Sequence, residues 1–202
     1  KLLEEVLAVN KNAVVLLFTG RPLALTRLNA IAPAILNVWW PGTECGNAVA
    51  NLLFGEVVPS GKITMSFPYA SGQCPIYYNH YRTGRPSPYG RYDILHATRY
   101  LDAPNEPLYP FGYGLSYTDF TYSGIELSSN SMECGGEITA SVTVTNAGKY
   151  KAKETVQLYI RDVAGSFVRP VKELKGFEKI ELDVGESKKI TFTITEEMLA
   201  FY

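Results

Sequence analysis

The residues best suited to bind a ligand lie in the middle of the chain. Tyr77, His80, Arg85 and Arg91 fall within a stretch that is rich in Tyr, Arg, Pro and Gly. Aromatic rings can stack on the apolar faces of a ligand, and arginine side chains donate hydrogen bonds to its polar groups. We therefore name these four residues as candidates for binding a substrate. The competing interpretation, which the sequence leaves open, is that they only clamp this stretch to neighbouring parts of the chain.

Glu44 is the carboxylate that stands in the most distinctive part of the sequence. It follows Thr43, a good helix N-cap, and precedes a helical pattern that continues through Leu53 and stops at Gly55. A carboxylate in the first turn is stabilised by the positive end of the helix dipole. We interpret Glu44 as stabilising the helix start, because a catalytic role would require a partner carboxylate in the same motif, which contains none.

Neither a metal site nor a cofactor is predicted. His80 and His96 are sixteen positions apart, without Cys or carboxylate residues at ligand spacing. The glycines Gly112 and Gly114 have a superficial likeness to a phosphate loop, but the pattern G-x-x-x-x-G-K-[ST] is missing. The odd number of cysteines, three, also argues against a disulfide framework.

Composition is that of a folded protein with 46% hydrophobic and 19% charged residues and a formal net charge of -1 over 202 residues. This length suits two modest domains. The near-neutral charge and the lack of a Lys/Arg cluster argue against nucleic acid or an anionic membrane as partner. No apolar run approaches the roughly 20 residues of a transmembrane helix. Without an initiator Met or a signal-peptide pattern, we expect a piece of a longer protein.

The first part of the chain, residues 1–70, has the pattern of an α/β domain. Short apolar runs at 13–18 and 34–40 are typical of strands buried between helical layers, and they alternate with helical patterns. A third strand is expected at 62–67, after a Pro-Ser-Gly turn. These patterns predict the later part of an open α/β sandwich domain with a largely parallel sheet.

The remainder divides into a strap and an all-β domain. Residues 71–118 show little periodicity, and their many aromatic side chains favour an ordered strap or linker over disorder. Residues 119–202 contain five strand patterns separated by turn residues, which is typical of a β-sandwich of the immunoglobulin or fibronectin type III kind. Roughly seven strands are usual, so we expect the last strands to be missing. We place Phe120, Tyr122, Phe177 and Phe192 mostly inward.

Three stretches of the chain resemble family 3 glycoside hydrolases of the β-glucosidase and β-xylosidase type. The run WWPGTECGNAVANLLFGEVVPSGKITMSFP at 39–68 is similar to a motif of their second domain. The run YPFGYGLSYTDF at 109–120 is similar to their bridge into a fibronectin type III-like domain, and RPVKELKGFEKIELDVGE at 169–186 continues the match. Cys45 departs from the family pattern, which usually has Gly or another small residue there.

The resemblance implies a retaining hydrolase that uses two carboxyl groups to release terminal β-linked glucose or xylose. In the family the nucleophile is an Asp on an N-terminal barrel, and in many members the acid/base Glu lies upstream of the segment that this chain matches. We therefore predict no catalytic residue within this chain, an inactive fragment, and a β-linked oligosaccharide or glycoside as substrate of the full-length enzyme. By the same resemblance, the substrate that Tyr77, His80, Arg85 and Arg91 are candidates to bind is a sugar. The resemblance to periplasmic β-glucosidases implies a periplasmic or secreted protein.

Two alternatives to the enzyme fragment remain open from the sequence. The chain could work alone as a carbohydrate-binding or protein-interaction module, or serve as a structural domain of a cell-surface protein. The sequence does not decide whether the chain forms a homodimer, for example through an unpaired edge of the incomplete sandwich. Preference for glucosides over xylosides is also left undecided.

Overall fold

The computed structural model describes residues 1–82, 84–85 and 95–201. The chain divides into two units, which we call the first and the second unit. The first unit consists of Lys1–Leu53, Ile63–Tyr78 and Arg82–Tyr113, and the second of Phe54–Lys62, Asn79–Tyr81 and Gly114–Tyr202. The chain therefore passes between the units several times, so neither unit is one continuous stretch of sequence. The predicted division into residues 1–70, 71–118 and 119–202 stays a prediction.

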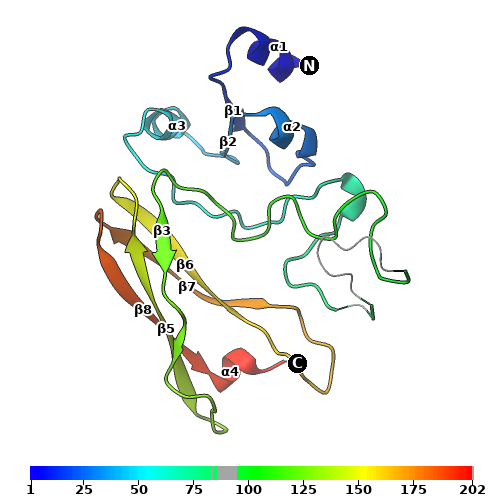
Figure 1. Ribbon diagram of the computed structural model, residues 1–202, viewed down its shortest axis with the longest axis vertical. Coiled ribbons are helices and arrows are strands. Elements are labelled where there is room, and N and C mark those ends of the chain that lie inside the picture. Colours follow the sequence, from blue (N-terminus) through cyan, green and yellow to red (C-terminus); the bar gives the residue numbers. More distant parts are fainter. Residues whose placement is uncertain (83, 86–94, 202) are drawn as a thin grey trace. The chain divides into compact units, whose positions relative to one another are not determined.

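The first unit begins with the predicted alternation of helices and strands (Figure 1). Its elements are α1 (Leu2–Val9), β1 (Val14–Leu17), α2 (Thr26–Ile31), β2 (Ala34–Asn37), α3 (Cys45–Leu53) and a short 3-10 helix η1 (Ser71–Gln73). Strands β1 and β2 are parallel, with Val14 opposite Ala34 and Leu17 opposite Asn37. Figure 1 shows α2 and α3 on opposite sides of this strand pair. No residue of β1 or β2 is buried, however, so the predicted burial between helical layers is not met in this chain.

The predicted third strand at 62–67 is not present. Within this stretch only Phe67 forms a β-bridge, and its partner is Tyr109 in an antiparallel arrangement. The apolar alternation is real, but the segment lies beside residues 108–113 instead of extending the β1–β2 sheet. Helix α3 is confirmed, although it begins at Cys45 and not directly after Thr43. Gly55 has a φ of 79°, as expected for a residue that follows the end of a helix.

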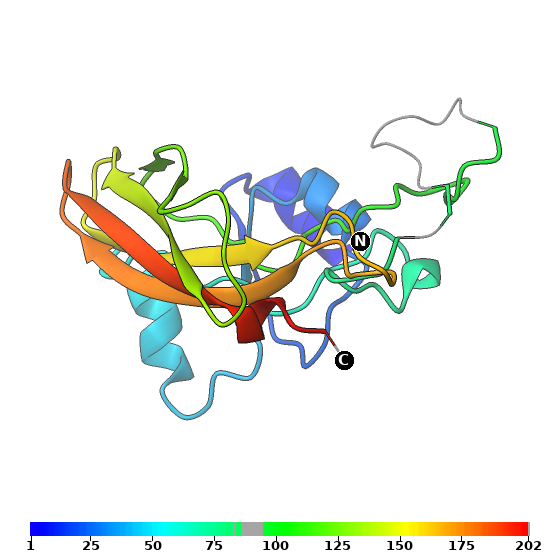
Figure 2. The same cartoon turned by 90° about the horizontal axis from the view of Figure 1, so that it is seen from below.

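The second unit is a two-layered β-sandwich. One sheet contains β3 (Phe120–Tyr122), β4 (Glu126–Leu127), β5 (Glu137–Asn146) and β8 (Ser187–Thr195), in which β5 pairs with the other three. The other sheet is the antiparallel pair of β6 (Ala152–Ile160) and β7 (Glu173–Leu182). A single helical turn, α4 (Glu196–Leu199), follows β8. Figure 2 shows this unit along another direction.

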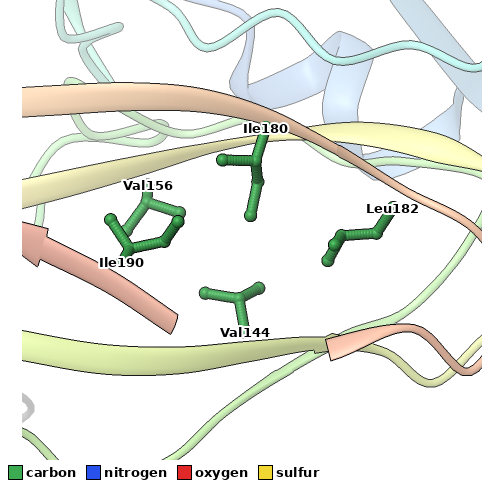
Figure 3. Close-up of a cluster of buried hydrophobic side chains, with 5 residues drawn as sticks. All are labelled: Val144, Val156, Ile180, Leu182 and Ile190. Atoms are coloured by element: carbon green, nitrogen blue, oxygen red, sulfur yellow. The ribbon is translucent and has the colours of Figure 1, made fainter. Parts of the chain in front are cut away.

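The core of the second unit is apolar and draws on both sheets. Val144 and Ile190 from one sheet point toward residues of the other (Figure 3). Those residues are Val156, Ile180 and Leu182, and every member of the cluster is at most 3% exposed. The partly buried Phe120 and Phe192 pack against this cluster, as predicted.

One of the aromatic residues that we placed inward, Phe177, is not, because it is 69% exposed. Tyr122 is 48% exposed, but its hydroxyl donates a hydrogen bond to the buried Glu154, so its side chain lies partly inward. On β7 the buried residues Ile180 and Leu182 are two positions apart, so Phe177 has the opposite parity and points to the other face. The alternation of side chains along a strand therefore predicts the outward position of Phe177, which the inward assignment did not take into account.

Candidate functional site

Two motifs that are far apart in the sequence run side by side in the first unit. The Phe67 amide donates a hydrogen bond to the Tyr109 carbonyl over 2.8 Å, and the Leu108 amide donates to the Phe67 carbonyl over 2.8 Å. Further along, the Ile63 amide donates to the Tyr113 carbonyl, and the Gly112 amide donates to the Ile63 carbonyl, both over 2.8 Å. This ribbon of residues 63–67 and 109–113 supplies the frame of the candidate site.

An aromatic cluster covers this ribbon. The Phe67 ring is only 2% exposed and lies with its centroid 5.8 Å from that of Trp39. Tyr109 packs edge-on against Phe67 at 6.0 Å and stacks on Tyr113 at 5.3 Å. Edge-on and offset-stacked arrangements are the favoured geometries of aromatic pairs. We call Trp39, Phe67, Tyr109 and Tyr113 the aromatic cluster.

Tyr109 joins the cluster to helix α2. Its Oη donates a hydrogen bond to Asn29 Oδ1 over 2.5 Å. Burial raises the pKa of the Tyr109 hydroxyl, and the neighbouring Tyr113 adds to this effect. Tyr109 therefore remains a neutral hydrogen-bond donor at ordinary pH and would not serve as a base there.

The carboxyl ends of β1 and β2 include a residue with unusual backbone geometry. Trp39, just beyond β2, has a φ of 52°, a left-handed conformation that is strained for a bulky residue. Its neighbour Trp40 is 83% exposed, and a Cβ on Gly20 beyond β1 would lie 2.9 Å from the Trp40 Nε1. In open α/β sheets, ligands bind at the carboxyl ends of the strands. This edge is thus the part of the first unit where the fold favours binding.

Gln73 fastens the segment that leads to the predicted sugar-binding residues. It is 2% exposed, and its Oε1 accepts hydrogen bonds from the amides of Tyr69 and Ala70. Its Nε2 donates to the carbonyl oxygens of Pro104, at 2.6 Å, and Glu106, at 3.4 Å. One buried amide side chain therefore holds residues 69–70 against residues 104–106.

The predicted binding residues do not form one cluster among the described contacts. Tyr77 is 63% exposed. Its neighbour Tyr78 stacks on Phe111, with the ring centroids 4.2 Å apart. Arg85 is exposed, and its carbonyl accepts a hydrogen bond from the Thr98 amide over 2.7 Å. Both belong to the first unit.

His80 belongs to the second unit, and Arg91 lies outside the described residues. The His80 side chain is exposed, with Nδ1 3.1 Å from the Tyr81 carbonyl oxygen, and the His80 carbonyl accepts a bond from the Val171 amide. These contacts tie His80 to local backbone. A role of Tyr77, His80, Arg85 and Arg91 in sugar binding stays a prediction.

Glu44 precedes α3, which begins at Cys45, so its predicted place in the first helical turn is wrong. Glu44 makes only local contacts just before the helix. Its Oε2 accepts a hydrogen bond from Asn47 Nδ2 over 2.6 Å, and its carbonyl accepts from the Ala48 amide. Within the part of the chain that the structure describes, no three His, Cys, Asp or Glu side chains gather in a way that could hold a metal ion. The aromatic cluster and the amides around it supply no pair of carboxyl groups for acid and base chemistry.

Asn29 and Gln73 could not be predicted from the sequence, because no local pattern marks either residue. Trp39 and Tyr109 belong to the motifs at 39–68 and 109–120, yet their contact through Phe67 could not be inferred from spacing. The signal that was available is the density of aromatic residues at the ends of both motifs. Such residues pack together more often than they stay exposed.

Comparison with known proteins agrees with the motifs. The model of the glycosyl hydrolase family 3 C-terminal domain matches residues 1–117, and that of the fibronectin type III-like domain matches residues 154–202. A periplasmic beta-glucosidase of Salmonella typhimurium is 51% identical over 195 residues, which are 96% of this chain and 25% of the relative. A putative beta-xylosidase of Formosa agariphila is 45% identical over 201 residues, again with 25% of the relative covered.

A solved structure confirms the fold class. The crystal structure of a beta-glucosidase from Listeria innocua in complex with glucose matches with a TM-score of 0.93 and 45% sequence identity. The match covers 100% of this chain and 28% of that protein. The chain thus spans about a quarter of the length of the relatives that it matches. None of the helices among the described residues has the length and apolar character to cross a membrane.

Proposed function

The chain belongs to the glycosyl hydrolase family 3 C-terminal domain family, and from this membership we propose that it is the C-terminal portion of an enzyme that hydrolyses terminal β-linked glucose or xylose. The observation that carries this proposal is the similarity of nearly the whole chain to proteins named beta-glucosidase and beta-xylosidase. The pairing of residues 63–67 with 109–113 supports it, because the two quoted motifs form one structural frame.

The proposed reaction is a retaining hydrolysis by two carboxyl groups. One carboxylate attacks the sugar to form a covalent intermediate, and the other first protonates the leaving group and then activates water; the two lie about 5–5.5 Å apart. We propose that neither of these groups lies in residues 1–202 and that the chain by itself is inactive. Its part in the enzyme is to position the exposed aromatic and arginine side chains, Tyr77 and Arg85 among them, at the edge of the sugar site.

The substrate of the longer protein would be a β-linked oligosaccharide or glycoside. A relative from Listeria innocua has been crystallised with laminaribiose and with glucose, which supports a gluco-configured ligand. The similarity to a periplasmic beta-glucosidase supports a periplasmic or secreted location. No cofactor is required by this chemistry, and a homodimer remains a proposal to be tested by sedimentation.

An activity assay on the 202-residue chain tests its proposed inactivity. The purified chain and its Glu44→Gln variant are incubated with an aryl β-glucoside and an aryl β-xyloside, and release of the aryl alcohol is followed. We expect no turnover by either protein. Turnover by the unaltered chain that Glu44→Gln abolishes would show that Glu44 is catalytic and would overturn the assignment.

A second assay on the longer protein tests the role in binding. We expect Tyr77→Ala to raise the KM for the aryl β-glucoside, whereas Tyr150→Ala, a matched change at an exposed tyrosine of the sandwich, leaves KM unchanged. The exposed Phe177 is the observation that favours the alternative of a stand-alone sugar-binding module. Saturable binding of cello- or xylo-oligosaccharides to the 202-residue chain in calorimetry, lost in Phe177→Ala, would establish that alternative.

A further inference from the structure

Lys62 is a lysine with little access to solvent. It ends the segment Phe54–Lys62, which belongs to the second unit together with the sandwich. Its side chain is 17% exposed, and its Nζ lies 3.1 Å from Glu154 Oε1, whose side chain is 9% exposed. The same Nζ donates a hydrogen bond to the Gly114 carbonyl over 3.0 Å. The ammonium group is therefore paired with a carboxylate and bonded to the backbone where it is shielded from water.

Glu154 is satisfied by a second donor from the other sheet. Glu154 lies on β6, and its Oε1 accepts a hydrogen bond from the Tyr122 hydroxyl of β3 over 3.0 Å. Burial, and then the charge and hydrogen bond of Glu154, raise the pKa of Tyr122 well above its usual value. The Tyr122 hydroxyl therefore keeps its proton and remains a donor. Glu154 thus binds Lys62 and Tyr122 with one carboxylate oxygen.

The backbone beside Lys62 also packs closely against the sandwich. A Cβ on Gly114 would lie 2.2 Å from the Gly61 carbonyl oxygen, so only glycine fits there. The Thr155 hydroxyl of β6 donates a bond to the Ser60 carbonyl over 3.4 Å. Residues 60–62 form no helix or strand, so these polar contacts and the close glycine approach are what hold them to the sandwich.

We infer that Lys62 is an anchor that fastens the segment Phe54–Lys62 to the sandwich, and that the segment is released only when the Lys62–Glu154 pair is broken. Removing one partner of a buried ion pair leaves an uncompensated charge, which is costly, whereas exposed pairs contribute little. The inference goes beyond the proposed function. The family model assigns these residues to the hydrolase domain, while their contacts join them to the fibronectin type III-like unit.

Lysine labelling of the full 202-residue chain measures this directly. Acetic anhydride is added under native conditions, and acetylation of each lysine is followed by mass spectrometry. We expect Lys62 to react about tenfold more slowly than Lys188, as suits a group that reacts only after local opening. Lys188 is the matched control, because it pairs with Glu178 at 3.3 Å but is 51% exposed. Equal rates for the two lysines would overturn the inference.

Two variants that each remove one carboxylate charge distinguish a local effect on Lys62 from a general loss of stability. We expect Glu154→Gln to raise the acetylation rate of Lys62 about tenfold and to leave that of Lys188 unchanged, since the buried pair is lost. Glu178→Gln should leave Lys62 unchanged. An unaltered Lys62 rate in Glu154→Gln would contradict the anchor. If Glu154→Gln accelerates every lysine because the chain unfolds, Tyr122→Phe decides: it keeps the Lys62–Glu154 pair, so Lys62 should stay slow, and faster acetylation of Lys62 there would contradict the pair as the anchor.

Limited proteolysis tests whether the whole segment depends on the anchor. In Lys62→Met, protease cleavage within residues 54–61 should be about tenfold faster than in the unaltered chain, while cleavage within β7 keeps its rate. Cleavage that stays slow within residues 54–61 would show that Lys62 is buried without anchoring the segment, which would overturn the inference. Activity of the longer protein does not enter either measurement, so failure here is distinct from failure of the proposed function.

Discussion

The Tyr109 hydroxyl donates a hydrogen bond to Asn29 Oδ1 over 2.5 Å, between residues that are 80 positions apart. Asn29 lies on α2, and Tyr109 lies in the ribbon that pairs residues 109–113 with 63–67. This bond therefore ties a helix of the α/β part to one of the two sequence motifs. The Tyr109 ring itself is packed by Phe67 and Tyr113 of the aromatic cluster.

Tyr109→Phe should destabilise the first unit by about 1 kcal/mol, the usual net contribution of one hydrogen bond. The ring would remain in place, so the packing on Phe67 and Tyr113 is kept. Urea unfolding followed by tryptophan fluorescence measures the change. Tyr113→Phe is the control in the same stack, expected to shift stability by less than about 0.5 kcal/mol. Equal losses of stability in both variants would show that the hydrogen bond to Asn29 does not stabilise the first unit.

The free energy of unfolding should fall as the pH rises above about 10, the ordinary tyrosine value. The pKa of Tyr122 and the pKa of Tyr109 are raised in the folded chain, so the folded state holds these protons more tightly than the unfolded state. Their contribution is complete below the unfolded pKa and is lost as the pH climbs through the folded pKa. The pKa of Lys151 is also raised in the folded chain, so its contribution to stability is likewise lost as the pH rises.

Tyr122→Phe isolates one contributor to this alkaline loss. Denaturant unfolding of the variant and the unaltered chain at neutral pH and above pH 10 should give a smaller pH-dependent loss in the variant. The neutral measurement serves as the internal control, because it records the missing bond to Glu154 separately. An identical alkaline loss in both proteins would remove Tyr122 from the explanation.

Asn146→Ala should destabilise the sandwich by about 2–4 kcal/mol, because it leaves several buried polar groups without partners. Asn146 is fully buried. Its Oδ1 accepts bonds from the Thr118 hydroxyl and the Gly148 amide, and its Nδ2 donates to the carbonyls of Tyr150 and Leu182. Thermal unfolding measures the change, with the exposed Thr121→Ala as a control that should stay within about 0.5 kcal/mol.

Leu182→Ala and Phe177→Ala should differ strongly in their effect on stability, although both residues lie on β7. Leu182 is completely buried in the core, so its truncation should cost about 2–5 kcal/mol. Phe177 is mostly exposed, and its truncation should cost less than about 0.5 kcal/mol. Denaturation midpoints of the two variants compare them directly. A large loss in Phe177→Ala would contradict the outward orientation found for this residue.

Gly114→Ala should destabilise the second unit, whereas Gly46→Ala should not. At Gly114 the added Cβ would lie 2.2 Å from the backbone oxygen of Gly61, so the main chain must shift. At Gly46, in α3, nothing lies within 4 Å of the added atom. Alanine is favoured over glycine in helices by about 0.5–1 kcal/mol, so this control should be neutral or stabilising. Circular dichroism during heating distinguishes the two outcomes.

The sequence by itself determined the family, the fold class and most of the secondary structure. Apolar runs at 13–18 and 34–40 became β1 and β2, and the alternation from Ile138 onward became the long strands of the sandwich. These elements follow from periods of 3.6 and 2, which are local properties of the chain. The motifs at 39–68 and 109–120 were sufficient to indicate the family, which the comparisons confirm.

Only the tertiary structure decided which distant segments meet. Residues 62–67 have the alternation of a strand, but they pair with 108–113 outside the sheet, because pairing partners are chosen by the whole fold. The same holds for Asn29 with Tyr109 and for Lys62 with Glu154, since polar side chains carry no local pattern that names their partner. Burying such a group is favourable only when its partner arrives with it, and that condition is met by three-dimensional packing.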